Sequence, residues 1–196
     1  MMNACARWSF LAVPVLAALG CSDPVPLPAQ GAISLSVTKP SGSDLMTGTD
    51  CPVPGITYSV GTKKSTVPTM SNPGESVIDG EGGAEVSCSV KGKGTFTFSG
   101  SLKAATIDTK DPITVTFTNG QIGADFTGTA TVSVFTPQLA GTYTSAAGGC
   151  KVKVINSQVK GGSIWASFTC PGITVPPSQQ CSVGTSVFVF ENCDGS

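Results

Sequence analysis

The sequence predicts an all-β protein: an antiparallel β-sandwich with three disulfides, preceded by a helical N-terminal signal peptide. Three observations lead to this prediction. Alternating apolar and polar residues recur through most of the chain, which is the period of a strand with one buried face. Glycine and proline clusters separate these stretches by roughly 8 to 12 residues, as in sandwiches and barrels. Most of the eight cysteines lie beyond residue 50.

Residues 1–20 have the composition of an export signal. A short head carries Arg7 and the amino terminus, and an apolar run from Trp8 to Leu19 follows it. This run is shorter than the roughly 20 residues that a membrane-spanning helix needs, and Pro14 interrupts it. We therefore expect a signal peptide and not a transmembrane anchor.

The apolar run ends in Ala18-Leu19-Gly20-Cys21, where small and apolar side chains directly precede a cysteine. This segment resembles the lipobox of bacterial lipoproteins. The resemblance implies that the Cys21 thiol is lipidated, that the signal is cut before it, and that acyl chains such as palmitate anchor the protein. The commonest lipobox has Leu in place of Ala18, and release as an ordinary secreted protein is the alternative. Ser22, where an aspartate would indicate retention in the inner membrane, implies the outer membrane of the bacterial cell envelope.

The chain divides into three predicted parts. Residues 1–20 are the signal peptide. Residues 21–31 hold the lipidated cysteine and a tether whose alternate prolines favour an extended backbone. Residues 32–196 are expected to form one β-sandwich domain, because this length suffices for one hydrophobic core.

Each predicted strand has one apolar face. In chain order these faces are Ile33, Leu35 and Val37; Ile56, Tyr58 and Val60; Val86, Cys88 and Val90; Phe96, Phe98 and Leu102; Ile113, Val115 and Phe117; Phe126, Ala130, Val132 and Val134; Cys150, Val152 and Val154; and Ile164, Ala166, Phe168 and Cys170. The run from Val187 to Phe190 is apolar on both faces, which indicates a central strand. Turns are expected at 92–94, 108–112 and 156–162, and Asn119-Gly120 predicts a hairpin.

The cysteine count agrees with an exported chain. Cys5 lies in the signal and Cys21 accepts the lipid, so three disulfides are expected among the others: Cys51, Cys88, Cys150, Cys170, Cys181 and Cys193. We predict the pairs Cys51 with Cys88, Cys170 with Cys181, and Cys150 with Cys193. There is no Cys-x-x-Cys and no histidine, so no metal site is expected. The tail Phe190-Glu191-Asn192-Cys193 resembles uncharacterised Cys-rich envelope lipoproteins, which implies no activity.

Composition argues against most catalytic classes. The chain has no histidine, and its only arginine, Arg7, leaves with the signal, so the mature protein lacks an imidazole and a guanidinium. A formal net charge of -1 gives no case for nucleic acid. We expect no enzyme and no cofactor. The alternative is a hydrolase with two carboxylates about 5 to 9 Å apart, and the same oxygens could ligate calcium, although no calcium-loop spacing occurs. The candidates are Asp44, Asp50, Asp79, Glu81, Glu85, Asp108 and Asp111.

The polar faces of the predicted strands carry regular threonine and serine ladders, for example Thr114, Thr116 and Thr118. Trp165 falls on a polar face, where an exposed ring can stack on a sugar. We predict a lipid-anchored envelope protein that is a non-enzymatic structural or binding module, held to the membrane by its lipid, with an envelope protein or a glycan as partner. The alternative is a carbohydrate-binding surface module that uses Trp165 and a threonine face.

Overall fold

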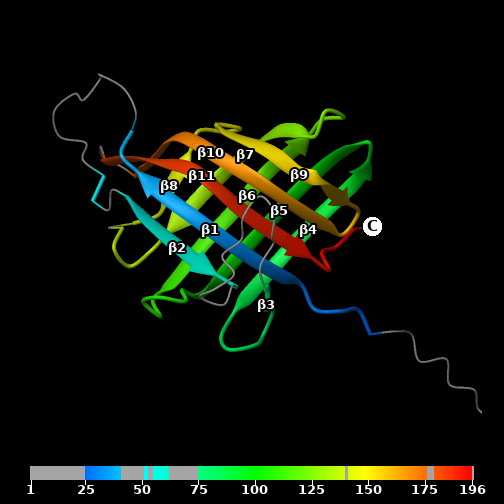
Figure 1. The fold of residues 1–196 in the computed structure, drawn as a ribbon, viewed down its shortest axis with the longest axis horizontal. Helices are drawn as coiled ribbons and strands as arrows, with labels where there is room; N and C mark the ends of the chain where they lie inside the picture. Colours follow the sequence, from blue (N-terminus) through cyan, green and yellow to red (C-terminus); the bar gives the residue numbers. More distant parts are fainter. Residues whose placement is uncertain are drawn as a thin grey trace, which may run out of the picture.

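The alternating pattern forms strands along nearly all of the described chain (Figure 1). The computed structural model describes residues 25–40, 51–52, 55–61, 75–139, 141–175 and 179–195. No helix occurs in these ranges. The predicted signal helix over residues 1–20 and the predicted lipid acceptor Cys21 lie outside them.

Eleven strands are present in the described residues. They are β1 Gln30–Thr38, β2 Ile56–Val60, β3 Val77–Ile78, β4 Glu85–Lys93, β5 Thr95–Ala105, β6 Pro112–Ile122, β7 Thr127–Phe135, β8 Tyr143–Ser145, β9 Cys150–Lys160, β10 Ser163–Val175 and β11 Gln179–Glu191.

All of these strands belong to one sheet, in the order β2-β1-β11-β10-β8-β7-β6-β5-β4, with β3 beside β1. Strands β8 and β9 both pair with β7 and β10, so they are two segments of one strand position, separated by a turn at residues 146–149. The sheet folds over into two layers, and the strands β1, β2, β10 and β11 cross those of β4, β5 and β6 (Figure 1). The predicted antiparallel all-β fold with three disulfides is confirmed. Its layers are continuous with each other and are not two separate sheets.

Phenylalanines fill the space between the layers. The ring centroid of Phe117 on β6 lies 4.3 Å from that of Phe188 on β11 and 5.1 Å from that of Phe168 on β10. Phe98 on β5 lies 5.7 Å from Phe188. All four side chains are buried, and truncation of such a residue typically costs about 3–5 kcal/mol. Phe188 belongs to the run that is apolar on both faces, and β11 is a central strand between β1 and β10, as predicted.

Distant backbone segments close the outer edge of β4. The Val90 amide donates to the Asp194 carbonyl, and the Asp194 amide donates to the Cys88 carbonyl, both at 2.9 Å. The Gly162 amide, in the turn between β9 and β10, donates to the Val90 carbonyl at 2.9 Å. An open edge presents unpaired backbone groups to other chains. These contacts therefore remove a site of edge-to-edge association.

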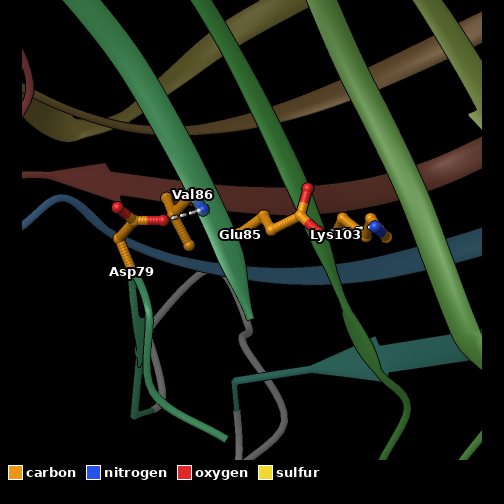
Figure 2. A network of polar contacts seen from close by, with 4 residues as sticks. All are labelled: Asp79, Glu85, Val86 and Lys103. Atoms are coloured by element: carbon orange, nitrogen blue, oxygen red, sulfur yellow. Dashed lines mark hydrogen bonds and ion pairs between the residues drawn. The ribbon is translucent and has the colours of Figure 1, made fainter. Parts of the chain in front are cut away.

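Figure 2 shows two side-chain contacts of β4, one at its outer edge and one with β5. The carboxylate of Asp79 accepts a hydrogen bond from the Val86 amide at 2.7 Å, which satisfies a backbone donor that faces no strand. The ammonium of Lys103 pairs with Glu85 at 2.5 Å across β4 and β5. Both partners of that ion pair are exposed, so it contributes little to stability.

The predicted disulfide pairs are wrong. The bonds join Cys51 to Cys181, Cys88 to Cys193, and Cys150 to Cys170. The prediction rested on closing a proline-rich loop and on fixing the C-terminal end, whereas the register of the strands decides the pairs. Lys151 lies opposite Thr169 in the ladder of β9 and β10, and one step further along it Cys150 meets Cys170. On β11, Cys181 lies opposite Ile173 and not opposite Cys170.

The predicted Asn119-Gly120 hairpin is also wrong. Strand β6 continues through both residues, and its registers with β5 and β7 both shift there, which marks a β-bulge. Asn119 takes the positive φ of 52°, which asparagine tolerates. A Cβ atom at Gly120 would lie 2.4 Å from the Phe98 ring, so the glycine is needed for packing.

Two further expectations changed. The predicted turn over 156–162 is narrower, because β9 runs to Lys160 with a bulge in which Asn156 and Ser157 have positive φ. Phe126, placed on an apolar face by the pattern, lies in the turn before β7, with φ 60° and 36% exposure. The alternation of buried and exposed residues begins only at Thr127, so it does not place Phe126 on the buried face.

Removal of the Cys88–Cys193 bond by double alanine substitution should lower the free energy of unfolding by about 2–5 kcal/mol. The bond closes a separation of 105 residues and lies beside the hydrogen bonds of the β4 edge. Guanidinium denaturation measures the loss. Hydrogen exchange of the Val90 amide should also accelerate, and it should stay slow in the matched Cys150→Ala, Cys170→Ala variant. Equal exchange in the two variants would contradict the role assigned to this bond.

Candidate functional site

The outward face of β4 to β10 carries the predicted hydroxyl ladders, brought together by strand register. One line of side chains crosses six strand positions and is called the bonded row: Ser87, Ser101, Thr116, Ser133, Thr144 and Thr174. Ser101 bonds Thr116 at 3.2 Å, and Ser133 bonds Thr144 at 3.0 Å. Four of its hydroxyls thus already have partners within the sheet.

A second line lies further along the strands and is called the exposed row. It consists of Lys91, Thr97, Gln121, Thr129, Lys151 and Thr169. Five of these side chains are exposed, and Thr169 is half-buried. Because its hydroxyl, amide and ammonium groups face solvent, this row can offer hydrogen bonds to a ligand that lies across the strands.

Shallow hollows lie at the two ends of the exposed row. One, of about 500 Å³, is bordered by Lys91, Thr97 and Gln121. The other, of about 430 Å³, is bordered by Lys151 and Thr169. Its remaining polar neighbours are Lys153, Thr127, Ser167 and Thr185. Both hollows are open depressions of the surface, so an extended ligand fits them better than a small enclosed one.

The turn between β6 and β7 presents Phe126, and Thr127, the residue that follows it, borders the second hollow. The Phe126 amide donates to the Gly123 carbonyl at 3.0 Å, and the Phe126 carbonyl accepts from the Val154 amide of β9 at 2.9 Å. These bonds hold the left-handed backbone, which is costly for a bulky side chain. Phe126 and Phe135 are the exposed aromatic residues of the described chain.

Asp125 in the same turn is an acid that the sequence did not single out. Hydrogen bonds from the Thr127 hydroxyl at 2.6 Å and the Thr127 amide at 3.2 Å lower the pKa of Asp125 below its ordinary value of 3.8. Asp125 is therefore ionised near neutral pH.

At β8, burial raises the pKa of Tyr143 above 10.0, and its hydroxyl donates to Gln179 at 2.6 Å.

Trp165 lies half-buried on the outward face of β10, opposite Val189 of β11. Its indole nitrogen is buried and has no hydrogen-bond partner, although an indole N–H usually finds one. Outward-facing neighbours such as Val187 and Val189 are also buried, so the ring adjoins an apolar part of this face. Its predicted role in binding a sugar stays a prediction.

The predicted carboxylates do not gather at one place in the described chain. Asp79 accepts from the Val86 amide, Glu85 pairs with Lys103, and Asp111 accepts from Gln138 at 3.0 Å. Asp44 and Asp50 lie outside the described residues. Within the described ranges, no group of three or more His, Cys, Asp or Glu residues is placed to hold a metal ion.

A scan against protein-family models and searches of curated proteins and of solved structures found no match to this chain. Among the described residues, no helix has the length and apolar character needed to cross a membrane.

We expect Thr127→Val to raise the pKa of Asp125 toward 3.8, because the substitution removes the shorter of the two hydrogen bonds and keeps the side-chain shape. An NMR pH titration of the Asp125 carboxyl carbon measures the change. Since the folded pKa is depressed, the contribution of this group to stability is present above pH 3.8 and is lost as the pH falls through the folded pKa. The control is Thr129→Val, on the same face of β7. An equal rise in both variants would contradict the assignment.

Proposed function

We propose that this chain is an exported, lipid-anchored module of the bacterial envelope that acts by binding or structure and not by catalysis. The pairing of all six cysteines beyond Cys21 carries the proposal, because such disulfides persist in oxidising compartments outside the cytoplasm. The lipobox-like segment before Cys21 supports attachment to the outer membrane.

The start of the first strand agrees with a tether. Residues 25–29 precede β1 without forming a strand, and Val25 and Leu27 are 88% and 71% exposed. An extended chain rises about 3.1 Å per residue, so a tether from Cys21 to Gln30 would hold the domain within about 30 Å of its lipid. The closed edge of β4 suits a domain that is displayed singly on a crowded surface.

Substitution of Cys21 by alanine tests the anchor. We expect wild-type protein in the membrane fraction and Cys21→Ala in the soluble fraction, because the lipid supplies the membrane affinity. Labelling with a palmitate analogue should be lost in parallel. Cys5→Ala is the matched control, since Cys5 lies within the predicted signal, and it should stay labelled and membrane-bound. Identical behaviour of wild type and Cys21→Ala would refute the anchor.

A second candidate function is carbohydrate binding. It is favoured by the exposed row, in which hydroxyl and amide groups follow one another across neighbouring strands between two hollows. A polysaccharide presents hydroxyls repeatedly along its length, so a line of donors and acceptors complements it.

A glycan array probed with the full-length, oxidised protein tests this candidate. We expect polysaccharide binding that falls several-fold in Thr97→Val, Thr129→Val, which removes two hydroxyls from the row and keeps the strand propensity. Thr57→Val is the control, because Thr57 is an exposed strand residue on β2 in the other layer. An array without signal would contradict the candidate.

A further inference from the structure

Lysines gather at the exposed row, although the chain as a whole has almost no net charge. The chain has a formal net charge of -1. On this face, however, four exposed lysines lie at or beside the exposed row: Lys91, Lys93, Lys151 and Lys153. Two acids lie near them in the strand pairing: Asp125, two residues before Thr127, which lies opposite Lys153, and Asp194, which lies opposite Ser89, two residues before Lys91. Four lysines thus face two acids. The local charge is therefore positive.

These lysines are available to a ligand. The ion pair present in the described chain joins Lys103 to Glu85, and neither Lys91 nor Lys151 takes part in one there. Both side chains are exposed, and each borders one of the two hollows. Their ammonium groups therefore need no rearrangement of an existing contact before they meet an anion.

The register sets how far apart the charges lie. Lys91 on β4 and Lys151 on β9 belong to the same row, and Thr97, Gln121 and Thr129 lie between them. Four strand spacings of about 4.8 Å separate the two positions by a path of about 19 Å along the curved outer face of the sheet. A ligand that reaches both must be extended, with anionic groups at both ends of this path and hydroxyl groups along it.

We propose that the exposed row binds an acidic polysaccharide, with carboxylates at Lys91 and Lys151 and sugar hydroxyls at the three residues between them. This inference rests on the proposed carbohydrate binding and names its substrate class. A polymer of sugar acids offers hydroxyl groups beside each carboxylate to the three neutral residues, whereas a nucleic acid, which carries a charge about every 1.7 Å of helix axis, would offer them mainly phosphates.

Phe126 directly precedes Thr127, which borders the hollow at the Lys151 end, and we assign to its ring an apolar contact with the ligand there. Its turn keeps an exposed aromatic ring on a left-handed backbone, a strained conformation of the kind that clusters at ligand-binding sites. Thr127, the next residue, lies opposite Lys153. A ring there can stack on the apolar face of a sugar while the lysines pair with its carboxylate.

Calorimetric titration of the full-length, oxidised protein tests the proposal, with polygalacturonate as the probe and its fully methyl-esterified form as the neutral match. We expect polygalacturonate to bind more tightly, and added salt to weaken only that interaction. Lys91→Gln, Lys151→Gln should lower the affinity about tenfold, a magnitude that two exposed charge contacts can supply. Lys160→Gln is the matched control, because Lys160 is an exposed lysine at the other end of β9. Asp125→Asn should tighten binding.

Phe126→Asn separates a binding role from a structural one. Asparagine tolerates a left-handed backbone, so the melting temperature should stay level or rise while the affinity for polygalacturonate falls several-fold. Equal affinity for the charged and esterified polymers would overturn the acidic class and leave carbohydrate binding intact. Binding of neither polymer would overturn both. Tighter binding of single-stranded DNA would overturn the polysaccharide in favour of a nucleic acid.

Discussion

The packing of aromatic rings between two layers of one folded sheet is the interaction on which the rest of this structure depends. Phe117, from the middle of β6, contacts Phe168 and Phe188 from the opposite layer, with centroid distances of 5.1 and 4.3 Å. Because the layers are continuous through β7, β8 and β10, the rings fix how sharply the sheet folds. Glycines make room for the rings, because a Cβ atom would lie 2.4 Å from the Phe98 ring at Gly120 and 2.6 Å from the Phe190 ring at Gly100.

Because side chains alternate between the two faces of a strand, the residues that build the core also decide which residues face outward. Most of the outward positions of β5, β6 and β7 carry serine or threonine. Strand register then converts separate ladders into rows that cross the sheet. The polar surface is thus a product of the same constraint that builds the core, and its rows have the spacing of the strands themselves.

Sequence reasoning could predict the fold class, most strand positions, the central β11 and the threonine ladders, because each depends on local periodicity. It could not predict the disulfide pairs, because these depend on which residues lie opposite each other. Cys150 and Cys170 meet through the register of β9 and β10, which bulges alter. The Asn119-Gly120 bulge shows the same limit, since the dipeptide suits either a hairpin or a bulge and only Phe98 decides between them. The exposed row was missed for this reason too. The alternating pattern indicates that Lys151 lies on the polar face of its strand, but it does not indicate that Lys151 lies in one row with Lys91.

The contact between the C-terminal segment and β4 has a consequence for assembly order. Residue 194 provides backbone partners for Cys88 and Val90, so the edge of β4 stays unpaired until about a hundred further residues have been synthesised. Closure of this edge is therefore a late step, because the Cys88–Cys193 disulfide and the hydrogen bonds beside it can form only once the C-terminal segment has been made.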